Sequence, residues 1–183
     1  MLGRFDVATT GRGTDWIDLA ADQKTLFYSG EGRIISRYNV ATSTQLADFA
    51  TLPGSGNAFA LRLLGDGGLL VADASNIKRL DGAGNVIQIY DTPGEDFFFA
   101  LNLDPNGTDF WTAGYSTGNV YKFNVSSGLL KTTIDTPGGN GVSGLVVKGE
   151  LTQGNPSVPE PSTVIFGVAL SFVCGALRSR RSR

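Results

Sequence analysis

The sequence predicts an all-β fold: a partial β-propeller of about three four-stranded blades plus flanking strands, followed by a single C-terminal transmembrane helix. The propeller is predicted from a sequence repeat. A four-residue segment that ends in Pro-Gly precedes each of three apolar runs, and these runs contain Leu61, Leu101 and Leu145. These leucines are 40 and 44 residues apart, and a period of about 40–45 residues is typical of propeller blades. Glycine and proline recur along the body, and no stretch before Ser162 keeps a helical apolar period. Helical repeats are therefore excluded.

The first predicted blade is located by counting 44 residues, the longer of the two spacings, back from Leu61. This position is Ile17, which lies in a short, mainly apolar segment. Polar turns follow at residues 21–24 and 29–32, and a strand is predicted over Ile34–Tyr38. Short strands separated by such turns are typical of all-β architectures.

The second and third predicted blades repeat this arrangement. The second has a Gly-Asp-Gly-Gly turn at residues 65–68 and then a strand over Leu69–Ala72. In the third, Asp-Pro-Asn-Gly at residues 104–107 predicts a hairpin turn, because proline presets one turn residue and Asn-Gly tolerates positive φ. Further turns are expected at residues 116–119 and 126–128. The four strands of the third blade are predicted at Phe98–Leu103, Asp109–Ala113, Val120–Asn124 and Leu129–Ile134.

The two ends of the body predict flanking strands. Arg4–Val7 is similar to the third-strand sequences of the later blades, and one further strand is predicted over Val142–Leu151. Propellers normally need at least four blades, and Arg4 and Asp6 interrupt any apolar leader at Met1. We expect the chain to be the C-terminal portion of a longer protein. The alternative is that the two end strands join into a composite fourth blade.

The blade sequences resemble known propeller families. Residues 70–80, Leu-Val-Ala-Asp-Ala-Ser-Asn-Ile-Lys-Arg-Leu, resemble the core of an NHL repeat. Residues 110–124 are closer to the streptogramin-lyase-like and gluconolactonase-like propellers. We interpret Asp73, Asn76 and Arg79 as a structural hydrogen-bonding set that braces a loop between strands.

The C-terminal segment predicts a membrane anchor. Pro159 and Pro161 prevent a helix from starting before Ser162, which is a good N-cap residue. Residues 164–177 carry no charge, and a helix over 162–177 would be about 24 Å long, slightly short of a hydrocarbon core of about 30 Å. Four arginines follow, and basic residues beside a span stay in the cytoplasm. They are Arg178, Arg180, Arg181 and Arg183.

Pro-Glu-Pro, an apolar helix and a basic tip, in this order, resemble the PEP-CTERM sorting signal of bacterial surface proteins. The resemblance implies that Pro159, Glu160 and Pro161 are the sorting motif and that an exosortase, a membrane-embedded protease, processes the tail. The domains are then blades over residues 1–152, a linker over 153–158 and the sorting tail over 159–183. The expected location is the bacterial cell envelope, with the body outside the cytoplasm. Later release to the surface or matrix is left open.

Charge and composition narrow the function. All seventeen acidic residues lie at or before Glu160, against eleven lysines and arginines over the same stretch, so this part carries a net charge near −6 and the tip carries +4. An acidic body argues against nucleic-acid binding, which needs clustered positive charge. The single cysteine, Cys174, lies inside the predicted span, so no disulfide is expected in the body.

Residues that could carry chemistry are few. The chain has no histidine, which excludes a Ser-His-Asp triad and a His-ligated zinc within it. Asp104, Asn106, Thr108 and Asp109 superficially suggest a calcium loop, but Asp109 stands where that loop needs glycine, and a hairpin turn explains them better. Phe97-Phe98-Phe99 could form a carbohydrate platform, but strand alternation places at least one ring in the core. We therefore predict no catalytic residue, metal or cofactor.

Two classes of function remain. The first is a non-catalytic surface or matrix protein, whose loops bind an extracellular polysaccharide or a protein. The second is a lactonase- or lyase-like propeller enzyme whose active site lies partly in blades outside this sequence. Lactonases of that type hold a divalent ion with Glu, Asn and Asp near the propeller axis, and such residues are scattered along this chain. We expect the first class.

Overall fold

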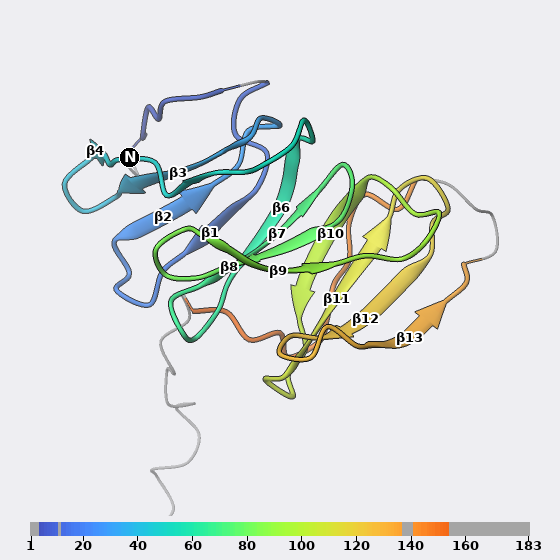
Figure 1. Cartoon of the computed structure of the whole chain (residues 1–183). Helices are drawn as coiled ribbons and strands as arrows, with labels where there is room; N and C mark the ends of the chain where they lie inside the picture. The colour runs from blue at the N-terminus through green and yellow to red at the C-terminus, as the bar shows by residue number, and fades with distance from the viewer. Residues whose placement is uncertain (1–3, 11, 137–140, 154–183) are drawn as a thin grey trace, which may run out of the picture.

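The computed structural model describes residues 4–10, 12–136 and 141–153. They form thirteen strands in three antiparallel sheets, and no helix occurs within these ranges. Figure 1 shows the sheets arranged as a fan. The strands are β1 (Ile17–Leu19), β2 (Thr25–Tyr28), β3 (Ile34–Asn39), β4 (Thr44–Gln45), β5 (Ala50–Thr51), β6 (Ala58–Leu63), β7 (Leu69–Asp73), β8 (Ile77–Leu80), β9 (Val86–Tyr90), β10 (Phe98–Leu103), β11 (Asp109–Gly114), β12 (Val120–Asn124) and β13 (Leu130–Ile134).

The predicted C-terminal helix over 162–177 lies outside the described residues, as do the sorting motif and the basic tip. Within the part of the chain that the structure describes, no helix is long and apolar enough to cross a bilayer.

The sheets are the three predicted blades, each a meander in which consecutive strands pair. The first blade contains β1–β5, the second β6–β9 and the third β10–β13. The predicted strands of the third blade are confirmed to within one residue at each end. The predicted turn at residues 104–107 joins β10 to β11, and Gly107 there has a φ of 74°, which glycine adopts without a steric penalty.

The outer strand of the first blade is interrupted. Both β4 and β5 pair with β3, so this sheet has five strands where four were predicted. Between them the Asp48 carboxylate accepts a hydrogen bond of 3.0 Å from the Ser36 hydroxyl. The amide of Phe49 returns to the carbonyl of Ile35 at 2.8 Å. Residues 46–49 therefore replace the central part of one outer strand.

Apolar side chains between consecutive blades make the core. Leu61 is fully buried in a cluster with Phe27 and Ile35 of the first blade, and Leu101 is fully buried in a cluster with Ile77 of the second. The repeat leucine of each blade thus faces the preceding blade. Ile17 holds the equivalent position in the first blade and is 57% exposed, because no described sheet covers that face.

Three aromatic rings reinforce the contact between the second and third blades. Tyr90 meets Phe110 edge to face, with ring centroids 4.9 Å apart, and Phe110 stacks on Phe123 at 5.5 Å. All three are at most 1% exposed. Buried rings of this size remove a large apolar area from water, and paired rings add about 0.5–1.5 kcal/mol beyond that burial.

The prediction of a strand over Val142–Leu151 is wrong, because residues 141–153 contain no strand. Val142 and Leu145 nevertheless pack against the third blade, and Figure 1 shows the orange segment running behind β10 and β11. A turn at residues 148–149, where Gly149 has a φ of 77°, directs Glu150 inward. Leu145 keeps the packing role of the repeat leucine without a strand around it.

The prediction of a strand over Arg4–Val7 is also wrong. This segment covers the open face of the first blade through single contacts: Phe5 meets the Tyr38 ring at 5.8 Å, and the Tyr28 hydroxyl donates to the carbonyl of Ala8 at 2.6 Å. Since neither end segment is a strand, the described residues contain no composite fourth blade.

The interface between blades gives a matched stability test. Leu101→Ala removes a fully buried side chain and should lower the free energy of unfolding by about 2–5 kcal/mol. Ile17→Ala, at the equivalent but exposed position, should change it by no more than about 0.5 kcal/mol. Urea unfolding monitored by tryptophan fluorescence measures both. Equal losses would contradict the packing described here.

Candidate functional site

A polar cluster lies where the innermost strands meet. Strands β1, β6 and β10 pack side by side, and the residue after each repeat position is polar: Asp18, Arg62 and Asn102. Glu150, from the segment that follows the third blade, joins them. We call these four residues the axial cluster.

Glu150 accepts most of the hydrogen bonds in the axial cluster. Its carboxylate lies 2.6 Å from Arg62 Nε and accepts from Asn102 Nδ2 at 2.7 Å. It also accepts from the backbone amide of Leu103 at 3.0 Å. The Arg62 guanidinium lies over the Trp16 ring at 5.0 Å. Glu150 thereby ties the C-terminal end of the body to the second and third blades.

Asp18 connects the first blade to the second. Its Oδ2 accepts a hydrogen bond of 2.9 Å from the backbone amide of Leu63, and its Oδ1 accepts from the amide of Leu19. Burial raises the pKa of Asp18 above its ordinary value, despite these amides and the nearby charge of Arg62.

The axial cluster brings together an Asp, an Asn and a Glu, the donor types that a propeller lactonase uses to hold a divalent ion. These residues are scattered along the chain, as expected, but the fold brings them together. They do not fit a metal, however, because both oxygens of Asp18 and both of Glu150 already accept hydrogen bonds. Arg62 supplies the positive charge instead. Across the described ranges, no group of three His, Cys, Asp or Glu residues is placed to hold a metal.

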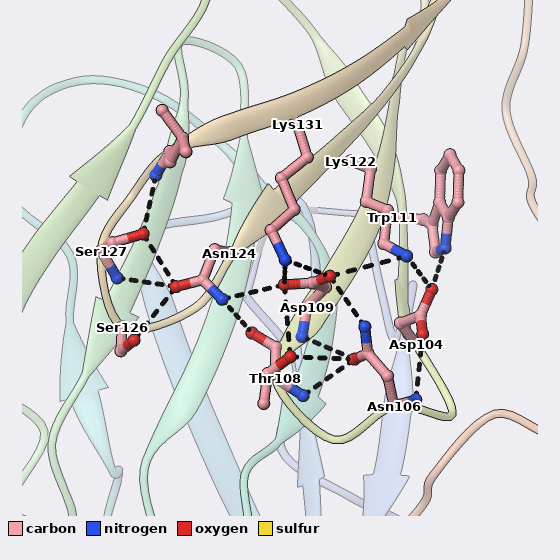
Figure 2. A network of polar contacts seen from close by, with 11 residues as sticks. Asp104, Asn106, Thr108, Asp109, Trp111, Lys122, Asn124, Ser126, Ser127 and Lys131 are labelled. Atoms are coloured by element: carbon pink, nitrogen blue, oxygen red, sulfur yellow. Dashed lines mark hydrogen bonds and ion pairs between the residues drawn. The ribbon is translucent and has the colours of Figure 1, made fainter.

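A second polar network braces the first hairpin of the third blade (Figure 2). Asp109 lies at its centre with a side chain only 1% exposed. It accepts from Lys131 Nζ at 2.8 Å, Asn124 Nδ2 at 2.9 Å and Asn106 Nδ2 at 2.8 Å. The network ties β13, the end of β12 and the β10–β11 turn to the start of β11. These residues form a brace at the hairpin turn that the sequence predicted.

Asp104 extends the same network to the blade surface. Its Oδ2 accepts from the Trp111 indole at 2.8 Å and lies 2.6 Å from Lys122 Nζ. Lys122 in turn lies 5.1 Å from the centre of the Trp111 ring. Figure 2 shows Lys122 between the two carboxylates. Lys122 on β12 and Lys131 on β13 therefore neutralise the carboxylates of Asp104 and Asp109.

Beside the axial cluster lies a groove of about 410 Å³. It is enclosed by turns of the second and third blades and by the chain after Glu150. Its walls combine apolar and polar side chains, among them Leu64, Asp66, Arg79, Asp104, Leu151 and Gln153.

Arg79 is the cationic side chain of this groove. Its terminal nitrogen donates to Asp66 at 2.8 Å, while its buried Nε has no hydrogen-bond partner in the described structure. A buried donor without a partner is costly. The Arg79 side chain as a whole is 19% exposed, so its guanidinium places a positive charge in the groove wall, where Asp66 holds it.

The carboxylates of the groove are held ionised. Although burial raises it, hydrogen bonds from Lys131, Asn124 and Asn106 hold the pKa of Asp109 below its ordinary value. The pKa of Asp104 is likewise lowered, by Lys122 and by the Asn106 amide, against the effect of burial. Groups of this kind accept hydrogen bonds at neutral pH and do not donate protons.

The set predicted from Asp73, Asn76 and Arg79 is confirmed in part. Asp73 Oδ1 accepts from the amides of Ser75 and Asn76 at 2.8 and 2.9 Å. Its other oxygen pairs with Lys78, which also donates to Asn76 Oδ1 at 2.7 Å. Arg79 takes no part, because the next side chain along a strand points to the opposite face. Lys78 is the member that the sequence analysis missed.

The three consecutive phenylalanines at residues 97–99 differ in burial. Phe98 is fully buried in the core, whereas Phe97 is 46% exposed with a φ of 57°. Phe99 stacks on Phe59 with centroids 4.0 Å apart and meets Tyr115 at 5.1 Å. The expectation that at least one ring lies in the core is confirmed.

Comparison with known proteins supports the fold. No family model and no curated protein sequence matches the chain. Among solved structures, the chain is similar to the crystal structure of the WD40 β-propeller domain of Doa1, with a TM-score of 0.60 and 20% identity. The match covers 68% of this chain and 41% of that one, so the chain spans less than half the length of that relative. The chain has a β-propeller fold, and this likeness shows the fold alone.

The hairpin brace predicts acid sensitivity. Because its folded pKa is lowered, Asp109 contributes stability that is complete above about pH 5 and is lost as the pH falls through the range below about 4. Asp109→Asn should therefore reduce the steepness of the loss of stability between about pH 5 and 2. Urea midpoints across this range measure it, with Asp135→Asn, an exposed carboxylate, as the control. An unchanged slope in Asp109→Asn would refute the role of this carboxylate.

Proposed function

We propose that the chain is a non-catalytic binding protein of the bacterial cell envelope, whose propeller binds an extracellular polysaccharide through the groove beside the axial cluster. The observation that carries the proposal is the groove itself, with its apolar walls, its ionised carboxylates and the partly exposed guanidinium of Arg79. Concave sites with apolar walls and a few fixed polar groups are typical of ligand sites.

The chemistry of the groove favours a hydroxyl-rich ligand. The Asp66 carboxylate, whose side chain is 53% exposed, can accept hydrogen bonds from sugar hydroxyls, and Arg79 can donate to a ring or carboxyl oxygen. Leu64, Leu103 and Leu151 offer apolar contact to the C–H face of a sugar ring. A protein loop is the other ligand class that such a surface fits.

The carboxylates that line the groove in the described part of the chain are poor proton donors, which favours binding over catalysis. A general acid needs a pKa raised toward the working pH, whereas the pKa values of Asp66, Asp104 and Asp109 are all lowered. These carboxylates are also engaged by Arg79, Lys122 and Lys131. The groove therefore has the properties of a recognition surface.

A lactonase- or lyase-like enzyme is the second candidate, supported by the axial cluster. There the raised pKa of Asp18 and its proximity to Arg62 and Glu150 resemble the environment of a general acid. This candidate requires a lactone-opening or lyase activity that Asp18→Asn abolishes and Arg79→Gln leaves intact.

The groove can be tested by binding. Arg79→Gln should weaken the binding of exopolysaccharide purified from the host at least about tenfold, because a hydrogen bond to a charged group is worth about 1.5–3 kcal/mol. Lys24→Gln, which removes an exposed positive charge outside the groove, should bind as the parent does. Isothermal titration calorimetry measures both. Equal affinities for all three proteins would remove the groove from the proposal.

The location rests on the sequence of the tail. We propose that Pro159, Glu160 and Pro161 direct exosortase processing, that the helix over 162–177 enters the membrane, and that Arg178, Arg180, Arg181 and Arg183 hold its end in the cytoplasm. Residues 164–177 are mostly apolar and carry no charged side chain, which supports insertion into the membrane. The arginines that follow support this orientation.

Replacing Pro159, Glu160 and Pro161 by alanine should leave the propeller folded but stop removal of the tail. Immunoblots of host fractions should then show only the longer, membrane-bound form. Replacing the preceding Asn155, Pro156 and Ser157 by alanine is the matched control and should be processed normally. Normal processing of the first variant would contradict the sorting assignment.

A further inference from the structure

The second and third blades each have a buried carboxylate at an equivalent position, but a different residue supplies it in each blade. Strand pairing makes Lys78 equivalent to Tyr121, since Lys78 pairs with Val71 and Tyr121 with Thr112. It likewise makes Asp73 equivalent to Gly114, because the amides of both donate to the carbonyls of equivalent asparagines, Asn76 and Asn119.

In the second blade this position holds a complete ion pair. Lys78 pairs with Asp73, and their side chains are 6% and 2% exposed. The same ammonium donates to Asn76 Oδ1 at 2.7 Å. A buried carboxylate is thus neutralised by a cation that also bonds the amide oxygen of the neighbouring asparagine, as buried charges require.

In the third blade the carboxylate comes from Glu95, in the loop before β10. A Cβ added to Gly114 would overlap the Glu95 carboxyl group, so Glu95 occupies the space that an aspartate side chain would fill. It is 4% exposed. Glu95 Oε2 accepts from the hydroxyls of Thr117 and Tyr121, the latter at 2.7 Å.

The third blade lacks the positive charge of this set. Tyr121 replaces the lysine, and burial together with Glu95 raises its pKa, so its hydroxyl stays neutral. Three buried oxygens of Glu95 and the residues linked to it have no hydrogen-bond partner in the described part of the chain: Glu95 Oε1, Asn119 Oδ1 and Thr92 Oγ1. A buried carboxylate surrounded only by neutral groups is costly.

We propose that the buried site around Glu95, which we call the Glu95 pocket, binds a monovalent metal cation, sodium or potassium, in the role that the Lys78 ammonium has in the second blade. The cation would be held by Glu95 Oε1, Asn119 Oδ1 and Thr92 Oγ1. Glu95 and Asn119 present carboxylate and amide oxygens, which are acceptors only, so each can bond a cation directly.

The charge of the pocket favours a monovalent ion over calcium. One carboxylate neutralises one positive charge, whereas calcium sites use six to eight oxygens and usually several carboxylates. Among the residues that the structure describes, no cluster of three acidic or other strong metal ligands occurs here.

Binding is tested directly on the full-length chain by ²³Na NMR and by thermal unfolding at constant ionic strength, with choline chloride exchanged for sodium chloride. The parent protein should broaden the ²³Na signal in a way that potassium reverses. Its Tm should rise by about 2–4 °C from choline to sodium. Glu95→Gln should lose both effects, while Asp96→Asn, an exposed neighbouring carboxylate, should keep them.

Two further variants separate a cation from other occupants. Tyr121→Lys restores the ammonium of the second blade, so its Tm in choline should equal or exceed that of the parent and no longer respond to sodium. Asn119→Asp adds a second carboxylate and should enlarge the sodium response. If the Asn119 amide instead donates to Glu95, this variant loses stability in every salt and the cation site is refuted.

The parent protein alone also decides the question, whether or not a variant folds. An unbroadened ²³Na signal together with a Tm that is the same in choline, sodium and potassium would show that the pocket holds water only, and would overturn the proposal.

Discussion

The structure depends on one constraint: each sheet is apolar on both faces, so each face needs a cover. The second blade meets this requirement with the first blade on one side and the third on the other. The outer face of the third blade is covered by Val142 and Leu145. The outer face of the first is covered only in part, by residues 4–10, and Ile17 stays exposed there. Stability in such an array is a sum of contacts between neighbours.

Polar contacts fix how the blades meet at the axis. Asp18 joins the first blade to the second through the Leu63 amide, and Glu150 joins the last described segment to the second and third blades. Apolar packing tolerates small rotations between sheets, but charged hydrogen bonds at these distances do not. The axial cluster therefore sets the geometry of the groove beside it, whose walls include residues next to Glu150 in sequence and in space.

Much of the fold could be predicted from the sequence because repeat period and turn chemistry are local signals. The spacing of Leu61 and Leu101 identified the blades, and Asp-Pro-Asn-Gly identified the turn before β11. The end segments were predicted wrongly as strands. Their side chains follow the repeat, as Leu145 shows, but a strand also needs a hydrogen-bonding neighbour, and local sequence does not report one.

The candidate site was harder to predict, because its residues are distant in sequence. Asp18, Arg62 and Asn102 share a repeat position, and an alignment of the blades could have identified them. Glu150 and Glu95 give no such signal, since each reaches its position from a loop. Glu95 also shows that a repeat can keep a carboxylate in place while changing the residue that supplies it. The sorting tail is read from sequence alone and lies outside the described residues.

Native-state hydrogen exchange tests the central claim, that contacts between blades stabilise the body, most directly. Amides of β6 and β10, which are buried between blades, should exchange only through global unfolding. Amides of β13, whose side chains are all exposed, should exchange much faster through local opening. If β6, β10 and β13 exchanged at the same rate, the contacts between blades would not be the source of stability, and this account of the fold would be contradicted.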